Sequence, residues 1–559
     1  MPFSFPHPAS PIESVLAGTT PNTRATRVPP IYRFWGTSFT RRGADGERIS
    51  YFRQPGIGAA DVEALGGGRG GWRIPCSPPK AELVMRLDKR HQTSVLLDPG
   101  AYDCLNLGDL AMLEVAISRW KALWPSAAIG VITATPEALA PYGVTPVSVR
   151  DRSIWLDTHL LGRLHKWLPR RAASPLEQIE RDLKMSGARS LQAALALRHQ
   201  ITRGDGSDIG AFVDWMRCAD VVALTGGGAL TDSFSVKALR ILDTLEMAAC
   251  RARRYGRPLT AIFGQGFGPL ADPALRRRAA EVLPQIDFIA IRENRASRSL
   301  LTALGVDKDR IVLTGDDAIE LAYDRRQGTV GGALGVNVRV AFYANTDAST
   351  LEVVRQAALA AARRHGAPLV PVPITRQPGG TQPYNAGQSD TAAIRDLLAG
   401  ISLEWNDGPE PDSPADVIRE VARCRVVVTG SYHGAVFALA QGIPAIGLAG
   451  SPYYRAKFAG LAEQFEGGIQ VADMGEAGWG SRLNAAIDTA WATAERMRPI
   501  LLEAARRQID LSRQAYVTVA RRAALRTASA VRVDPGSVEL MAGRLQSPAC
   551  DGGSGRRSS

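Results

Sequence analysis

Short, continuous apolar runs, each followed by a longer stretch of helical composition, most constrain what this chain of 559 residues can fold into. A first series of such runs occupies residues 94–97, 128–133, 221–225, 260–264, 288–291 and 310–314. A second series starts near Gly335 and continues at 368–374, 425–430 and 445–450. Strands without polar alternation are buried on both faces, and the intervening helices supply the cover. We therefore predict an α/β fold with two doubly wound parallel-sheet domains that face each other across a cleft.

The composition along the chain sets the predicted boundaries. Residues 1–85 are rich in Pro, Gly and Arg and are interpreted as an irregular extension. The two α/β domains are expected at 86–325 and 326–480, joined by the polar, Gly-rich segment 322–332. Helices are predicted at 481–533, and 534–559 is expected to form a flexible tail.

The net charge of +12 suits an anionic partner such as a phosphorylated substrate, nucleotide, nucleic acid or membrane face. No nucleic-acid motif is recognised, so we predict no nucleic-acid partner. The six cysteines form no C-x-x-C pair, and we predict no metal site. The first residues do not resemble a secretory signal, and no run of 18 apolar residues occurs. We expect a cytoplasmic protein whose membrane contact, if any, is peripheral and at the inner face.

Four turns follow predicted strands directly and are candidates for ligand contact. Their candidate residues are Asn106 and Asp109, Gly226, Gly227 and Gly228, Gln265 and Gly266, and Asp316. Three successive glycines let the backbone approach an anion closely and favour a ligand site there. For Asp109 and Asp316 the spacing predicts capping of the next helix at least as strongly as substrate contact.

His433 follows a buried strand and begins a predicted helix, directly after Ser431 and Tyr432. This position places its imidazole at the cleft, where it can meet an anion. Arg292, Arg339 and Lys457 border apolar strand ends. Arginine matches carboxylate and phosphate bidentately, so these cations are candidate substrate ligands.

Taken together and in order, segments from Ser94 to Phe465 resemble the polysaccharide pyruvyl transferase family. The segments are Asn106–Asp109, Gly226–Gly228, Gly264–Leu270, Arg292–Gly305, Thr314–Asp316, Val336–Arg339, His433–Leu448 and Lys457. The resemblance implies a fold similar to GT-B glycosyltransferases, phosphoenolpyruvate as donor with no further cofactor, and a sugar of a glycan or its lipid-linked precursor as acceptor. It implies functional roles for Arg292 and His433. Many members have arginine two residues before the histidine, where this chain has Ser431.

For such a reaction we expect His433 to act as general acid or phosphate ligand, with Arg292 and Lys457 holding the donor's charges. Asp109 or Asp316 can serve as base on a hydroxyl. Two alternatives stay open: a nucleotide-sugar glycosyltransferase on the same plan, and a catalytically silent glycan-binding member. The acceptor sugar, and whether the product is a ketal or an enol ether, are not determined by the sequence.

Overall fold

The computed structural model describes residues 92–149, 208–339, 348–376, 389–401 and 411–533, and two strands in the N-terminal region. The chain divides into two compact units, 1–78 and 79–559. In the first unit, β1 (Ser38–Arg42) and β2 (Arg48–Phe52) pair antiparallel, a ladder that the sequence analysis did not predict. The rest of the N-terminal extension and the predicted tail lie outside the described residues.

The first sheet of the second unit is parallel throughout and has the order β10-β9-β8-β6-β3-β4-β5, with β7 pairing β8. Its strands are β3 (Ser94–Asp98), β4 (Ala128–Thr133), β5 (Thr145–Ser148), β6 (Val221–Leu224), β7 (Gly227–Leu230), β8 (Leu259–Phe267), β9 (Phe288–Ile291) and β10 (Ile311–Leu313). All six apolar runs of the first series form strands, and β5 and β7 are additional. Because β7 begins at the second glycine of the triple-glycine turn, no helix follows these glycines directly, and α5 begins only at Ser235. Strand β8 also continues through Gln265, so the third predicted turn starts later.

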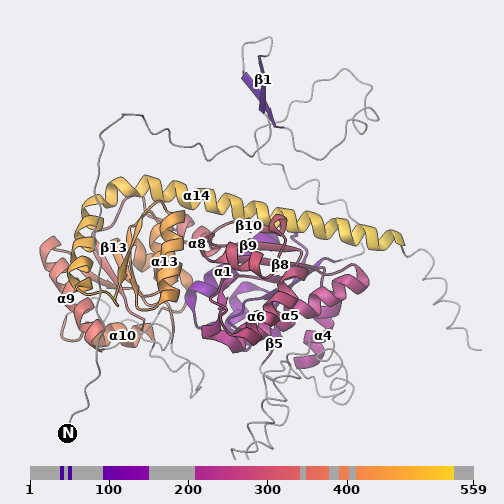
Figure 1. Ribbon diagram of the computed structural model, residues 1–559, viewed down its shortest axis with the longest axis horizontal. Coiled ribbons are helices and arrows are strands. Elements are labelled where there is room, and N and C mark those ends of the chain that lie inside the picture. The colour runs from indigo at the N-terminus through magenta and orange to yellow at the C-terminus, as the bar shows by residue number, and fades with distance from the viewer. Residues whose placement is uncertain are drawn as a thin grey trace, which may run out of the picture. The chain divides into compact units, whose positions relative to one another are not determined.

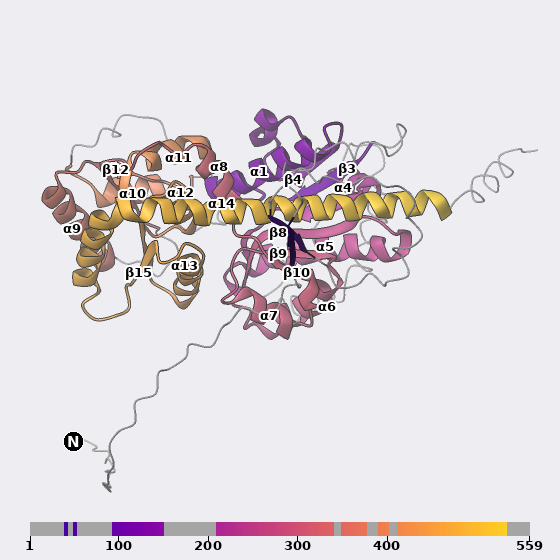
Figure 2. The ribbon, with the colours of Figure 1, turned by 90° about the horizontal axis from the view of Figure 1, so that it is seen from above.

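The helices of this first lobe cover both faces of the sheet (Figures 1 and 2). They are α1 (Leu107–Leu123), α4 (Asp208–Cys218), α5 (Ser235–Tyr255), α6 (Pro273–Val282), α7 (Ser297–Ala303) and α8 (Ala318–Asp324), with short 3-10 turns at Pro136–Tyr142, Asp232–Phe234, Leu283–Gln285 and Lys308–Arg310.

The second sheet is also parallel, in the order β12-β11-β13-β14-β15. Its strands are β11 (Ala333–Asn337), β12 (Leu369–Pro371), β13 (Cys424–Thr429), β14 (Ala445–Ala449) and β15 (Ile469–Asp473). Its helices are α9 (Ala348–His365), α10 (Asp390–Leu397), α11 (Pro414–Ala422), α12 (Tyr432–Ala440) and α13 (Pro452–Gln464). The prediction of two parallel-sheet α/β domains is confirmed.

Each sheet has a topological switch point that decides where a ligand can bind. In the first sheet the chain moves from β3 to β4 and β5 on one side, then returns to β6 on the other. In the second, β11 lies between β12 and β13. At such points the loops leave in opposite directions and open a crevice at the carboxyl ends of the strands. The loops after β3, β6, β11 and β13 are therefore the structural candidates for a site.

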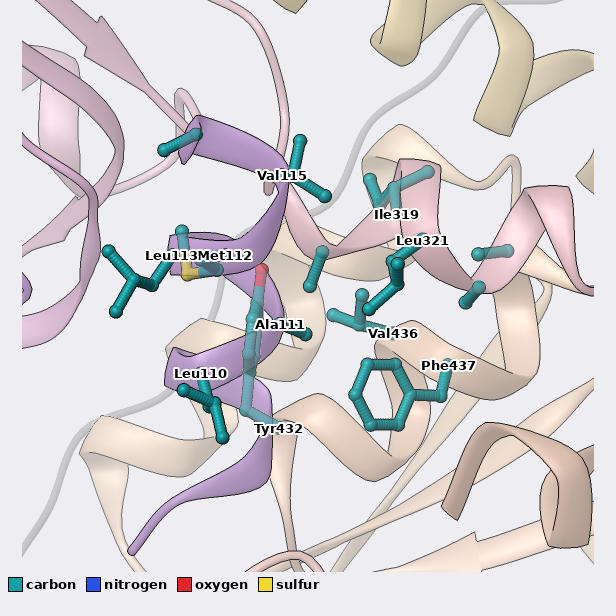
Figure 3. Close-up of a cluster of buried hydrophobic side chains, with 14 of the residues drawn as sticks. Leu110, Ala111, Met112, Leu113, Val115, Ile319, Leu321, Tyr432, Val436 and Phe437 are labelled. Carbon is teal, nitrogen blue, oxygen red and sulfur yellow. The ribbon is translucent and has the colours of Figure 1, made fainter. Parts of the chain in front are cut away.

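The two lobes are joined by helical packing. Apolar side chains of α1, α8 and α12 pack together, as Figure 3 shows for Val115, Ile319 and Phe437, and all three residues belong to one buried cluster. The long helix α14 (Trp479–Val533) contacts β8 and β9 of the first sheet and β13 and β14 of the second (Figures 1 and 2). Across the described residues, we find no helix with both the length and the apolar character needed to cross a membrane.

Candidate active site

The switch points of both sheets border one open pocket, whose space of about 910 Å³ between the protein atoms includes open solvent. Ten of the thirteen residues predicted from the sequence line it. They are Asn106, Asp109, Gly226, Gly227, Gly228, Arg292, Arg339, Ser431, His433 and Lys457. Asp316, Gln265 and Gly266 are not among the lining residues.

Asp316 lies behind the pocket wall, and its side chain is fully buried. Its Oδ2 atom is 3.2 Å from Arg292 Nη1 and 3.6 Å from His433 Nε2. Burial alone would raise the pKa of this carboxyl, but His433 and Arg292 outweigh burial and hold the pKa below its usual range. Asp316 therefore stays ionised and orients two pocket residues, so we assign it a positioning role and not that of a base on a sugar hydroxyl.

Arg292 follows β9 and is 2% exposed. Its guanidinium stacks on the Tyr432 ring at 3.9 Å, and although burial disfavours the charge, Tyr432 and Asp316 raise its pKa. Gly266 makes space for it, because a Cβ there would lie 2.7 Å from Arg292 Nε. Gln265 donates from Nε2 to the Gly266 carbonyl at 2.6 Å. These two residues thus support Arg292 from behind the pocket.

His433 lies in the first turn of α12, after the N-cap residue Ser431, and is 5% exposed. Its ring rests on α1, where a Cβ on Gly108 would lie 2.0 Å from His433 Cγ. Its Nε2 atom is buried 3.6 Å from Asp316 Oδ2, and its Nδ1 atom faces α1, 2.2 Å from where a Cβ on Gly108 would stand. Gly108, in the first turn of α1 in one lobe, therefore leaves the space that the His433 ring of the other lobe occupies.

The start of α1 differs from the expectation for Asp109. Asn106 is the N-cap, and its Oδ1 accepts from the backbone N–H groups of Gly108 and Asp109. Asp109 is therefore not the capping residue, and its carboxylate lines the pocket. A carboxylate in this place is available to a substrate hydroxyl.

The glycine turn after β6 is shaped by close packing. Gly226 has φ 102°, and a Cβ there would lie 2.4 Å from both Met112 Cε and the Phe263 carbonyl oxygen. The Gly228 carbonyl accepts a hydrogen bond of 3.0 Å from the Tyr453 hydroxyl, which comes from α13 in the other lobe. The turn therefore joins the two lobes along one wall of the pocket.

The sequence analysis did not select several lining residues. They are Asp103, Phe234, Lys237, Tyr432, Tyr453 and Tyr454. Tyr432 stands between the predicted Ser431 and His433, and Tyr453 and Tyr454 lie four and three residues before the predicted Lys457. This spacing, which places Tyr453 and Tyr454 on one helix face with Lys457, was the signal that could have identified them. Arg339 lines the pocket, and its Nη1 donates to buried Asp390 at 2.8 Å.

Asp98, at the end of β3 beneath the pocket loop, provides a prediction about pH. Its carboxylate is 1% exposed and accepts from the backbone N–H of Gly100 at 2.8 Å and, at a longer 3.4 Å, from the Tyr102 hydroxyl. Burial raises its pKa from 3.8 to about 6. Because the pKa of Asp98 is higher in the folded state than in the unfolded state, its contribution to the free energy of unfolding is greatest below the unfolded pKa of 3.8. This contribution falls by roughly 3 kcal/mol in all as the pH rises through about 6.

Asp98→Asn keeps the acceptor for Gly100 and can donate to Tyr102. We expect the variant to match the wild type near the unfolded pKa of 3.8 and to be more stable above about 6. Denaturant unfolding at both ends of this range measures the difference, with Asp309→Asn, an exposed carboxylate, as control. If the free energy of unfolding differed between Asp98→Asn and the wild type by the same amount at low and at neutral pH, the raised pKa of Asp98 would be contradicted.

The fold and the pocket define a two-lobed α/β protein whose ligand site is basic, glycine-lined and formed between facing strand ends. The family model of polysaccharide pyruvyl transferases matches residues 106–452. The chain belongs to this family of transferases, as its sequence segments predicted. No curated protein matches the chain significantly.

Solved structures with similar architecture include a glycosyltransferase, a protein in complex with UDP and an epimerase. A glycosyltransferase from Rickettsia africae is 12% identical, with a TM-score of 0.43, covering 77% of this chain and 98% of that one. HepE of Anabaena, solved in complex with UDP, is 14% identical, with a TM-score of 0.42 and coverage of 78% and 100%. UDP-GlcNAc 2-epimerase from Neisseria meningitidis is 11% identical, with a TM-score of 0.41 and coverage of 75% and 99%. Nothing about the substrate of this chain follows from likenesses this weak.

Proposed function

We propose that this protein transfers the pyruvyl group of phosphoenolpyruvate to hydroxyls of a sugar in a polysaccharide or its lipid-linked precursor, and that it does so on the cytoplasmic side of the membrane. The observation that carries the proposal is the convergence of Arg292, Lys457 and His433 in one pocket of a chain from this family. A donor with a carboxylate and a phosphate needs at least two cations and a group that can hold a transferable proton.

The proposed reaction starts with protonation of the donor's methylene carbon, which makes the neighbouring carbon electrophilic. A sugar hydroxyl then bonds to that carbon, phosphate leaves with the electron pair of its C–O bond, and a second hydroxyl closes a ketal. His433 is the general acid or a phosphate ligand, and Asp109 is the lining carboxylate that can take a hydroxyl proton. Arg292 holds donor charge while Asp316 fixes its direction.

Ser431 stands where many relatives have arginine, so the donor site of this chain lacks one cation. The neighbouring cations on the pocket wall are Lys457 and Arg339. Because Arg339 is already bound to Asp390, Lys457 is the residue that supports donor binding in the absence of that arginine.

The test is thermal stabilisation by phosphoenolpyruvate of wild type and of Arg292→Ala, each compared with its own unliganded form. A ligand at a hundred times its Kd adds about 2.7 kcal/mol of stability. We expect a clear shift for the wild type that is lost in Arg292→Ala and kept in Arg295→Ala, whose side chain is 55% exposed and pairs with Glu463. A shift with UDP and none with phosphoenolpyruvate would support the glycosyltransferase alternative instead. Binding without phosphate release in the presence of glycan acceptors would support a silent, glycan-binding member.

A further inference from the structure

Lys457 has surroundings that are unusual for a cation. It lies on α13, and its Nζ atom is 3.9 Å from the centre of the Tyr453 ring and 5.8 Å from those of Tyr432 and Tyr454. It also approaches the glycine turn of the other lobe, since a Cβ on Gly228 would lie 2.6 Å from Nζ. The Lys457 side chain is half-buried on the pocket wall, and its amine lies over the Tyr453 ring with two further phenol rings nearby.

No carboxylate neutralises this amine at ion-pair distance. Within the described ranges, Lys457 Nζ forms no ion pair within 4.0 Å. Asp109, Asp316 and Glu293 act on it only at longer range, and two of these carboxylates have other partners. Asp316 holds Arg292 and His433, and Glu293 accepts from the backbone N–H groups of Ala296 and Ser297.

A second cation lies beside it. Arg292 Nη2 would be 3.1 Å from the same Cβ position on Gly228 that Lys457 Nζ approaches. Arg292 stays charged because Tyr432 and Asp316 favour its guanidinium. Repulsion between this guanidinium and an ammonium on Lys457 therefore lowers the pKa of the lysine. Arg292 pairs with Asp316 through Nη1, while its Nη2 atom and Lys457 Nζ both approach Gly228, so that two nitrogen donors meet at one place where a multiply charged anion can bind.

The balance of effects favours the uncharged amine while the pocket is empty. Burial, and then the charge of Arg292, lower the pKa of Lys457 well below its ordinary 10.5, against the opposing pull of Asp109, Asp316 and Glu293. Attraction to the tyrosine faces favours the ammonium, while removal of the amine from water and the charge of Arg292 favour the free amine. The described pocket is also lined by other titratable or charged groups: Tyr432, Tyr453, Tyr454, His433, Asp103, Lys237 and Arg339.

We infer that Lys457 is the proton carrier of this pocket: a free amine when the site is empty, an ammonium when an anionic donor binds beside Arg292, and the acid that protonates the donor's methylene carbon. The inference rests on the proposed function and deepens it. In the chemical step an N–H bond of the ammonium breaks, a C–H bond forms with the electron pair of the donor's double bond, and the hydroxyl oxygen bonds to the carbon left electrophilic. The hydroxyl proton passes to Asp109, and the amine is regenerated. His433 then has the remaining role of phosphate ligand.

The first test is the number of protons taken up when phosphoenolpyruvate binds, measured by calorimetry in buffers with different ionisation enthalpies. At about pH 8, above the ordinary pKa of histidine, we expect uptake of about one proton per donor by the wild type. Lys457→Arg keeps a permanent charge, so donor binding should persist while uptake falls to zero and kcat is lost. Lys457→Met should lose uptake and also bind the donor more weakly.

Donor binding without proton uptake by the wild type, or full kcat in Lys457→Arg, would overturn the inference and leave the proposed function intact. If phosphoenolpyruvate does not bind at all, the proposed function fails, and the protonation state of Lys457 is still measurable by itself. Labelling of the folded protein with acetic anhydride across a pH series, read by mass spectrometry, compares Lys457 with exposed Lys308. A midpoint for Lys457 clearly below that of Lys308 supports the inference, and equal midpoints refute it.

Discussion

Replacing Arg119 by alanine is expected to lower the free energy of unfolding by about 3–5 kcal/mol, the cost of removing one partner from a buried ionic network. Arg119, on α1, is 8% exposed, and its guanidinium binds Asp317 at 2.9 Å, Ser512 at 2.6 Å and Glu320. Tyr516 donates to the other oxygen of Asp317 at 2.7 Å. The network joins α1, α8 and α14, so its loss leaves Asp317 buried with an uncompensated charge.

Denaturant unfolding measures this effect, and the chain offers a matched control. Arg295→Ala removes an arginine whose pair with Glu463 is about half exposed on both sides, so its effect should stay within about 1 kcal/mol. The double variant Arg119→Ala with Asp317→Asn should recover part of the loss, because the unpaired charge is gone. An Arg119→Ala protein as stable as Arg295→Ala would show that this network does not hold the helices together.

Gly108→Ala is expected to reduce acceptor-dependent phosphate release from phosphoenolpyruvate by about 100-fold, the usual consequence of moving a catalytic group by about 1 Å. The new Cβ would lie 2.0 Å from Cγ of His433 and 2.2 Å from Nδ1, so the imidazole must leave its place. The backbone of α1 is not the cause, since alanine favours a helix over glycine by about 1 kcal/mol.

Gly332→Ala is the control, because a Cβ there meets nothing within 4 Å. It should retain activity, and both variants should keep a cooperative unfolding transition. Binding of phosphoenolpyruvate to Gly108→Ala should weaken if His433 holds phosphate and persist if His433 acts only in the chemical step. Unchanged phosphate release by Gly108→Ala would remove His433 from the mechanism.

The strands could be predicted from the sequence because their signal is local. Phe288–Ile291 and Ala128–Thr133 form strands with the predicted limits, since a continuous apolar run must be buried on both faces wherever it lies. By contrast, β7 contains two of the three glycines and has little strand propensity of its own, and it forms because β8 offers a partner.

The sequence by itself determined the order of strands, helices and glycine turns, and which turns carry ligand-type residues, because each of these depends on neighbours along the chain. Only the tertiary structure decided which of those residues meet. It placed Asp316 behind Arg292 and His433, bound Arg339 to Asp390, and left Asp109 free of capping. It also enclosed Lys457 with tyrosines from two helices opposite Gly228. These outcomes depend on how close in space the fold brings residues that are up to hundreds of positions apart in the sequence. The effects of burial and of neighbouring charges depend on those distances in space.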